Sequence, residues 1–493
     1  MIRDSYLPLA TCRIQMDGME QIKERLLKAK KMIIYGAGAV ANIVYLYAVQ
    51  MGIENRIIAF AVSDMRGNPN CKNGLPVIQA KEILSLDRHA LMIVAVQKST
   101  QDAILSNLAN LGCDDYIVLA PDALIDSFYK TLHQSPIVKN KLFFMNYNGC
   151  GYGCNPKYIA EYLRKEYGEN KFDIVWGVDD SGYDIPDDIR TVQIGTYQYY
   201  SEIATSHIWI DNARKQIDIR KREGQFYIQT WHGAAPMKRV EGDIADKVPQ
   251  SHINASKRDS EMADLFLSGS RFYTDLYKRA FWYDGEILEV GLPRQDIFWN
   301  IDYAKEKVKK YYHIDEDKWL VLYAPTFRDD FSADAYDLDI LAVSKAIEKK
   351  FSCQCVMCVS RHPNNKHIQY NFGTQDYIDV SGYDDFEEIL AAANILITDF
   401  SGCAYDFSLT GNPVFLYQKD YQEMVAQRDF YVSMEDMPYP RAETTEELVR
   451  SIFEYDKEMY MEHLESFMER FGNFDDGHAS ERVCERIVGI LNG

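Results

Sequence analysis

Short apolar runs alternate with longer segments of helical periodicity along the whole 493-residue chain. The runs have the length of buried strands, and the segments between them repeat apolar residues at the spacing of a helix. This alternation predicts an α/β fold with parallel sheets. We expect strands at residues 32–35, 57–62, 91–96, 116–119, 142–145, 174–178, 207–210, 226–228, 265–267, 319–323, 355–359, 395–397 and 414–417.

The order of these elements and the length of the chain divide it into about three domains. The pattern predicts a Rossmann-like accessory domain at residues 1–138, opened by a helix at 19–30. Two further Rossmann-like units follow at 139–300 and 301–493, and the second begins with a helix at 305–311. A closing helix at 481–491 has Ser480 as its expected N-cap.

The first unit carries a glycine-rich turn between its first strand and the next helix. Gly36, Gly38 and Ala41 form a G-x-G-x-x-A pattern, which is typical of loops that bind a nucleotide diphosphate. Asp64 follows the second strand but lies 28 residues after Gly36, farther than the usual ribose-binding acid. The pattern therefore leaves two readings open: a site for an NAD-like nucleotide or nucleotide sugar, or glycines that only allow close packing of strand and helix.

Two histidines and an anion-binding turn follow strands in the second and third units. His232 and His362 each come directly after a predicted strand. The strand at 395–397 leads into Thr398, Ser401 and Gly402 at a helix start, where hydroxyl and backbone N–H groups can hold a phosphate. Such groups at the carboxyl ends of strands favour phosphoryl-transfer chemistry in a cleft.

These words, in this order, resemble the CDP-glycerol glycerophosphotransferase family, whose members build teichoic-acid-like poly(polyol phosphate). The resemblance spans residues 143–490. It rests on Asn155-Pro156-Lys157, Trp209-Ile210-Asp211-Asn212-Ala213-Arg214, Gln229 to Gly233, Gly291 to Asp296, Tyr323 to Asp330, His362-Pro363, Thr398 to Ser401 and Asp475 to Ser480. It implies a type-B glycosyltransferase fold made of two Rossmann-like halves, with the acceptor on the first half and the CDP-polyol donor on the second.

The resemblance also implies roles for the residues of the cleft. His232 is the expected general base and His362 the expected contact to the donor diphosphate. Donor binding is expected at Arg328, Arg361, Thr398, Ser401, Gly402 and Asp406, although Asp406 could equally be an ordinary acid on a helix surface. Further substrate-binding candidates are Trp231, Gly233, Lys238, Arg239, Arg294 and Asp296, and each cation among them could instead form a salt bridge at the rim.

The implied reaction is the transfer of a polyol phosphate, glycerol phosphate first, from a CDP-polyol to a hydroxyl of a glycan or a lipid-linked acceptor, with release of CMP. Two alternatives remain open on the residues alone. One is a nucleotide-sugar glycosyltransferase on the same fold. The other is an NAD-linked or nucleotide-sensing protein that acts through the first unit.

Composition narrows the partners and the compartment. The net charge of −20 argues against nucleic-acid binding. No apolar run reaches the length of a membrane span, which predicts a cytoplasmic protein. Peripheral contact with the inner face of the membrane would rely on one basic cluster with two leucines. That cluster is Lys23, Arg25, Lys28, Lys30 and Lys31 with Leu26 and Leu27, and a solvated helix face explains it as well.

No metal or cofactor is required by the proposed chemistry, because fixed histidine and arginine donors can stabilise the phosphates. Cys355 and Cys358 with His362 and His367 have a zinc-like spacing, but strand alternation places the two cysteines on opposite faces. In the third unit, Asp384 and Glu387 form a capping-box pattern before an apolar helix. We expect that helix to be structural, with its acids capping or solvated.

Overall fold

The structure is a computed structural model that describes residues 18–113, 115–233, 237–326, 328, 336–361, 372, 374, 376–427 and 429–493. The contacts divide the chain into two compact units. Unit 1 holds residues 1–138 together with the short segments 193–205 and 216–224, and unit 2 holds the rest. The pattern of the sequence did not indicate that these two segments pack with the first unit. The boundaries of the three predicted domains stay a prediction.

Unit 1 is built on one sheet in the strand order β3-β4-β2-β1-β5-β6. Its pairs are parallel except for β3 with β4. The strands are β1 (Met32–Tyr35), β2 (Ile57–Val62), β3 (Cys71–Lys72), β4 (Leu75–Gln79), β5 (Leu91–Val94) and β6 (Tyr116–Val118). The helices are α1 (Met19–Lys28), α2 (Ala39–Gln50), α3 (Ile83–Leu86), α4 (Lys98–Asn110), α5 (Pro121–Leu132) and α7 (Tyr197–Thr205). Central strands β1 and β5 are buried along their whole length, as expected for a sheet covered on both faces.

Unit 2 contains two sheets. The first has the order β13-β12-β11-β10-β7-β8-β9. The chain adds strands on one side of β7 up to β9 and then on the other side from β10, so the strand order reverses between β7 and β10. Its strands are β7 (Val138–Met145), β8 (Asp173–Val178), β9 (Arg190–Gln193), β10 (Ser206–Asp211), β11 (Phe226–Gln229), β12 (Leu265–Ser268) and β13 (Glu286–Glu289). Its helices are α6 (Cys154–Tyr167), α8 (Gln250–Met262) and α9 (Arg271–Ala280), with the short helices η3 (Tyr147–Gly149), η4 (Glu241–Ile244) and η5 (Pro293–Trp299). Ligands of such sheets bind at the carboxyl ends of the strands beside the reversal.

The second sheet of unit 2 has the order β16-β15-β14-β17-β18-β19, again reversing beside its first strand. Its strands are β14 (Trp319–Ala324), β15 (Cys355–Val359), β16 (Ile378–Asp379), β17 (Ile395–Thr398), β18 (Val414–Tyr417) and β19 (Arg441–Ala442). The helices are α10 (Ile301–Tyr312), α11 (Ile340–Phe351), α12 (Phe386–Ala392), α13 (Cys403–Ser408), α14 (Tyr421–Gln427), α15 (Thr445–Glu454) and α16 (Lys457–Phe471). The α/β class and the parallel sheets predicted from the pattern are confirmed.

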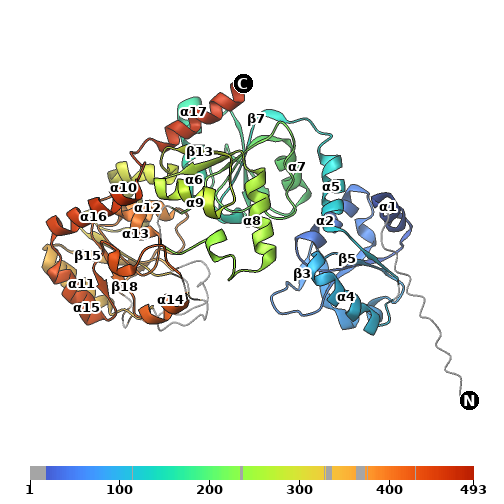
Figure 1. The fold of residues 1–493 in the computed structure, drawn as a ribbon, viewed down its shortest axis with the longest axis horizontal. Coiled ribbons are helices and arrows are strands. Elements are labelled where there is room, and N and C mark those ends of the chain that lie inside the picture. The colour runs from blue at the N-terminus through green and yellow to red at the C-terminus, as the bar shows by residue number, and fades with distance from the viewer. Residues whose placement is uncertain are drawn as a thin grey trace, which may run out of the picture. The chain divides into compact units, whose positions relative to one another are not determined.

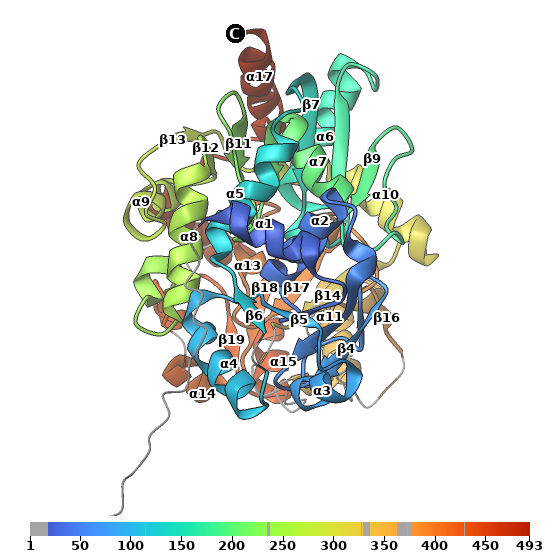
Figure 2. The ribbon, with the colours of Figure 1, turned by 90° about the vertical axis from the view of Figure 1, so that its right-hand side faces the viewer.

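The closing helix α17 (Ala479–Asn492) returns to the first sheet of unit 2. Its residues Val483, Cys484 and Ile487 are buried in one cluster with residues of β7 and α6. Figure 1 and Figure 2 both show α17 beside α6 and β7. The chain therefore crosses between the two halves of unit 2 twice, which ties the halves together.

Candidate active site

The turn after β11 carries Trp231 and His232, and two side chains hold the backbone of Trp231. Trp231 has a φ of +52°, a conformation that a bulky residue rarely adopts. Its backbone N–H donates to Oε1 of Gln229 at 2.9 Å, and its carbonyl accepts from Nδ2 of Asn155 at 3.0 Å. These two bonds fix a strained backbone, and such strain concentrates at functional sites.

His232 is half-buried, and one hydrogen bond fixes its tautomer. Its Nδ1 lies 2.6 Å from the carbonyl oxygen of Asn212. Because a carbonyl only accepts, Nδ1 must carry the proton, and in the neutral ring Nε2 then has the free lone pair. Burial is the main cause that lowers the pKa of His232 to about 4; nearby Arg294 and Arg214 contribute to the shift, and the bond to Asn212 opposes it. At neutral pH the ring is therefore an uncharged base.

Asn212 is itself held at the reversal point of the sheet. It follows β10, and its Nδ2 donates to Oδ1 of Asn146 at 2.7 Å. Its Oδ1 accepts from the backbone N–H of Tyr147 at 2.7 Å. These bonds join the ends of β7 and β10 beneath His232. The sequence reasoning singled out neither Asn212 nor Asn146 for a role, although both are polar residues directly after apolar strands.

The ring of Trp231 supports the ring of His232. The two rings stack at 4.3 Å with an angle of 28° between their planes. On its other contacts, Trp231 meets the edge of Phe281 at 4.8 Å and the guanidinium of Arg214 at 5.7 Å. Arg214 is anchored by Asp259 at 3.0 Å. Trp231 is 9% exposed, so it positions the histidine from within the protein.

Arg294 connects the histidine turn to the second sheet of unit 2. Its Nη1 donates to the carbonyl of His232 at 2.7 Å, and its Nη2 donates to Asp406 on α13 at 2.9 Å. Gln295 donates to the other oxygen of Asp406 at 2.7 Å. Glu387 on α12 lies 3.6 Å from Arg294. Asp406 is 5% exposed, so the alternative of an acid on the helix surface is wrong.

The predicted donor residues of the second sheet gather at the ends of β14 and β17. Thr398 is fully buried and donates to the carbonyl of Ala324 at 2.7 Å. Ser401 Oγ accepts from the backbone N–H of Cys403 at 3.3 Å, and Gly402 is the N-cap of α13. Arg328 pairs with Asp399 at 2.7 Å and also with Asp420. The structure brings these residues together, and the side chains of Thr398, Ser401 and Arg328 each have a partner within the protein.

The comparisons with known proteins decide the family. The model described as CDP-Glycerol:Poly(glycerophosphate) glycerophosphotransferase matches residues 127–489. The chain belongs to this family. The teichoic acid poly(glycerol phosphate) polymerase of Staphylococcus epidermidis is 30% identical over 380 residues, which cover 73% of this chain and 52% of that protein. The polymerase of the same name from Bacillus spizizenii is 26% identical over 367 residues, covering 71% of this chain and 92% of that one.

A solved structure of the wall teichoic acid polymerase TagF, a histidine-to-asparagine variant with CDPG, has a TM-score of 0.66 to this chain. It is 26% identical and covers 81% of this chain and 99% of its own. The resemblance drawn from the sequence motifs is thereby confirmed, and so is the type-B glycosyltransferase-like fold. The chain spans about half the length of the S. epidermidis polymerase that it matches.

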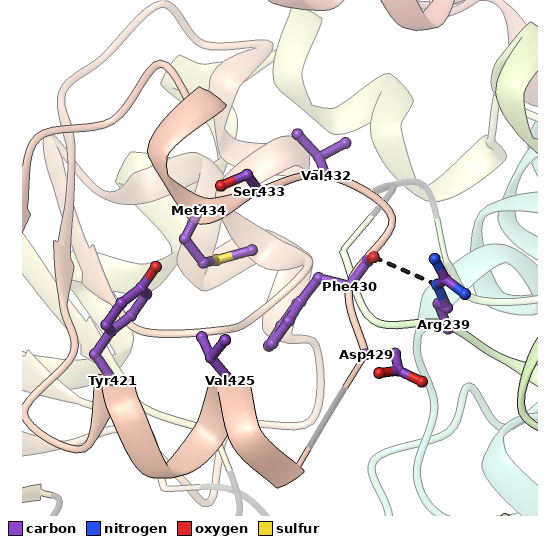
Figure 3. A pocket seen from close by; sticks show the side chains of 8 residues that line it. All are labelled: Arg239, Tyr421, Val425, Asp429, Phe430, Val432, Ser433 and Met434. Carbon is purple, nitrogen blue, oxygen red and sulfur yellow. Dashed lines mark hydrogen bonds between the residues drawn. The ribbon is translucent and has the colours of Figure 1, made fainter.

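In this glycerophosphotransferase-family chain, Lys238 and Arg239 lie on a segment that bridges the halves of unit 2. Lys238 pairs with Phe430 in an isolated antiparallel bridge, and the Arg239 backbone N–H donates to Asp429 at 2.9 Å. Beside this bridge is a cavity of about 270 Å³, lined by Arg239, Tyr421, Val425, Asp429, Phe430, Val432, Ser433 and Met434. Figure 3 shows Tyr421 and Val425 rising from α14 toward Met434, while Arg239 reaches the carbonyl of Phe430. Both halves therefore line this cavity.

Two predicted residues have other partners than the expected substrate. Asp296 accepts from the backbone N–H groups of Ala479 at 3.0 Å and Ser480 at 2.7 Å, and so caps α17. Arg361 pairs with Asp379 beside β16. Gly233 is fixed by space, since an added Cβ would lie 2.3 Å from Oη of Tyr273. The substrate-binding roles of these residues stay predictions.

Several predicted residues lie outside the described part of the chain. They are His362, Pro363 and His367, and Phe327, Asp329 and Asp330. The four residues with the zinc-like spacing are therefore only half described: Cys358 is buried and Cys355 is half-buried on β15. Among the described residues, no group of three or more His, Cys, Asp or Glu side chains could hold a metal ion.

The glycine turn of unit 1 has a packing reason for one glycine. Gly36 has a φ of +128°, and an added Cβ would lie 2.6 Å from the carbonyl oxygen of Ala95. A Cβ on Gly38 would meet open space, and Ala41 is buried in α2. Asp64 pairs with exposed Arg66 at 2.6 Å, and this pair lowers the pKa of the carboxyl. Nucleotide binding at this turn stays a prediction.

The helix expected to be capped by Asp384 differs in its details. Asp385 is the N-cap of α12 and accepts from the Glu387 backbone N–H at 3.0 Å. Asp384 is exposed, but Glu387 and Glu388 are 6% and 3% exposed, so Glu387 is not a solvated acid. Lys157 on α6 pairs with Glu388 at 2.8 Å and also with Asp385. The apolar pattern could not show this, because the partners come from the other half of unit 2.

Proposed function

We propose that this protein transfers a polyol phosphate from a CDP-polyol to an acceptor hydroxyl with release of CMP. Glycerol phosphate is the polyol phosphate that we favour. The observation that carries the proposal is the neutral His232, whose tautomer is set by Asn212 so that Nε2 can accept a proton. The family match supports the reaction class and favours it over transfer of a sugar. Which polyol is used rests on experiment.

In the proposed step, Nε2 of His232 takes the proton of the acceptor hydroxyl as its oxygen attacks the phosphorus that bears the polyol. The new P–O bond forms the phosphodiester, and the bond from that phosphorus to the oxygen of CMP breaks. The proton leaves with the imidazolium and passes to solvent after the step. A base of this kind contributes a factor of roughly 10²–10⁴ to the rate.

The donor half supplies the groups that would hold the diphosphate. Ser401 and Gly402 stand at the start of α13, and Arg328 forms ion pairs with the nearby Asp399 and with Asp420. We assign His362 the contact that stabilises departing CMP. The proposed roles of Arg294 and Asp406 are positional, because each already fills the other's hydrogen bonds.

The acceptor is proposed to be a glycan or polymer end, carried on a lipid at the inner face of the membrane. The family and its named relatives act in teichoic acid synthesis. No helix among the described residues is long and apolar enough to cross a membrane. The protein would therefore reach a lipid-linked acceptor from the cytoplasmic side by peripheral contact.

The test is product analysis with a panel of donors. Purified protein is incubated with a polyol-phosphate acceptor and with CDP-glycerol, CDP-ribitol or a UDP-sugar, and products are identified by mass spectrometry. The proposal predicts acceptor extended by a polyol phosphate together with stoichiometric CMP. Extension by a sugar with release of UDP would overturn it and establish the glycosyltransferase alternative. A retained nicotinamide cofactor with no transfer would favour the nucleotide-sensing alternative.

A further inference from the structure

A second cavity lies in unit 1, apart from the residues of the candidate active site. It has a volume of about 480 Å³, and α5 and the segment 216–224 supply its lining. The lining residues are Asp126, Tyr129, Lys130, His133, Gln134, Arg220, Lys221 and Arg222. Four cations therefore face one carboxylate. In a chain with a net charge of −20, such a local reversal attracts an anion.

Some of the buried polar atoms in this lining have no hydrogen-bond partner among the described residues, and those of Tyr129 and His133 bear on a ligand. They are Oη of Tyr129 and Nε2 of His133, whose rings lie 5.3 Å apart. Tyr129 is 1% exposed, and the backbone amide of Arg220 faces its oxygen without completing a hydrogen bond. A buried polar atom without a partner is costly unless a water, an ion or a ligand satisfies it.

Both side chains are uncharged at neutral pH, and each carries one proton that it can donate in a hydrogen bond. Burial and then Asp218 raise the pKa of Tyr129 well above its usual value, so the phenol keeps its proton. Burial and then Arg222 lower the pKa of His133, so the imidazole is neutral at pH 7. A phenol O–H and an imidazole N–H beside lysine and arginine are donors suited to phosphate oxygens.

The end of α5 would by itself repel an anion, because its last carbonyls carry partial negative charge. Arg222 compensates this partial negative charge. Its Nη1 donates to the carbonyl of His133 at 2.6 Å and its Nη2 to the carbonyl of Ser135 at 2.8 Å. Arg220 is held in place by Asp122 at 2.8 Å and Asp126 at 2.6 Å. The arginines thus fix the walls of the cavity, and Lys130 adds a charge on an exposed side chain.

We propose that this cavity of unit 1 is a binding site for a phosphate-bearing ligand, held by Tyr129, Lys130 and His133 against the arginine walls. The shared chemistry is a phosphate group with oxygen acceptors, supplied by a free phosphate ester or by a segment of poly(polyol phosphate). The polymer as occupant rests on the proposed function, whereas the anion site itself does not. A product-binding site on unit 1 would keep a growing polymer bound between transfers.

The test is calorimetric titration of the full chain with three probes: inorganic phosphate, glycerol phosphate and a short oligomer of glycerol phosphate. No nucleotide is added, because CMP is itself a phosphate ester and would compete for the site, and the loss of affinity in the variant separates this site from the transferase cleft. We expect binding by the wild type and a loss of affinity of at least roughly tenfold in the double variant Tyr129→Phe/Lys130→Ala, which removes two donors without a large change in shape. Lys165→Ala, at a side chain that is 81% exposed on α6, is the matched control and should bind as the wild type does.

Equal affinity in the double variant, or no binding of any probe by the wild type, overturns the site. Circular dichroism and the melting temperature show that the variant is folded, and Tyr129→Phe alone gives a second, isosteric test. Tighter binding of the oligomer than of glycerol phosphate identifies the polymer as the occupant, and equal binding identifies a free phosphate; either result supports the site. Transfer activity is measured separately, so failure of the proposed function leaves this outcome readable.

Discussion

His232 is the proposed base, so its replacement tests the chemistry in a protein that keeps its fold. His232→Ala should lower kcat by roughly 10²–10⁴, because the reaction loses its base. The measurement is steady-state CMP release, with circular dichroism to verify the fold. The control is His252→Ala on an exposed position of α8, which should change nothing. Wild-type turnover by a folded His232→Ala protein would remove the assignment.

The pH profile gives a second readout of the same residue. Because the pKa of His232 in the folded protein is about 4, the neutral base persists at mildly acidic pH. An unfolded histidine titrates near 6.5. The folded value is depressed, so the stability from this group is complete above about pH 6.5 and is lost as the pH falls through about 4. We expect the contribution of the base to kcat to persist as the pH falls, down to about pH 4.

Two buried acids lie beside Arg294, and we expect replacement of each by its amide to have different effects on stability. Burial and Asp385 raise the pKa of Glu387 to about 8, so this acid carries a proton at neutral pH and Glu387→Gln imitates it. Asp406 forms the ion pair with Arg294, and Asp406→Asn leaves the buried guanidinium without its partner, at a cost of about 3–5 kcal/mol. Urea unfolding at pH 7 measures both.

The pH dependence of this pair of variants has a definite sign. The folded pKa of Glu387 is raised above its usual value of 4.5, so the folded state holds the proton more tightly than the unfolded state does. The stability from this group is therefore present below about pH 4.5 and is lost as the pH rises toward 8. Wild type should weaken over that interval relative to Glu387→Gln. Parallel curves for the two proteins would refute the raised pKa.

At the scale of elements, the turn after β11 needs glycine at position 233, because there is no space for a side chain there. In Gly233→Ala the new Cβ would lie 2.3 Å from Oη of Tyr273, so the turn must move. A displacement of about 1 Å in a catalytic group costs roughly a hundredfold in rate. We expect kcat to fall by about that factor. Tyr273→Phe added to Gly233→Ala removes the colliding oxygen and should restore part of the rate; no recovery would place the fault elsewhere.

The sequence predicted central elements well and edge elements poorly, for a physical reason. The strands Met32–Tyr35 and Ile57–Val62 have the predicted bounds because both are continuous apolar runs inside a covered sheet. Strand β13 (Glu286–Glu289) was missed: it has two glutamates and lies at the edge of its sheet. The pattern also placed His232 after its strand, but the carbonyl of Asn212 that fixes its tautomer depends on tertiary contact and leaves no trace in periodicity.

For the molecule as a whole, the basic cluster considered for membrane contact has several of its cations paired with acids. Lys28 pairs with Glu24 at 2.5 Å, Lys31 pairs with Asp87 at 2.9 Å, and Arg25 pairs with Asp115. Leu26 is 3% exposed and serves the core. With these charges compensated and a net charge of −20, anionic lipid should attract the protein weakly at most. Sedimentation with anionic liposomes should show slight binding that high salt abolishes, and tight salt-resistant binding would contradict this.

The division of the molecule into units makes a sharper claim about where it can be cut. A chain beginning at Lys139 loses α5, although Tyr200 of α7 packs edge-on against Phe128 at 5.4 Å and Arg220 pairs with Asp122. A chain beginning at Pro121 keeps these partners. We therefore expect residues 121–493 to remain soluble and to bind CMP, whereas residues 139–493 expose the buried face of α7 and aggregate. Size-exclusion chromatography and CMP titration measure both. If 139–493 is monomeric and binds CMP as the full chain does, segments 193–205 and 216–224 do not need unit 1, and the sequence boundary at 138/139 marks an independent domain.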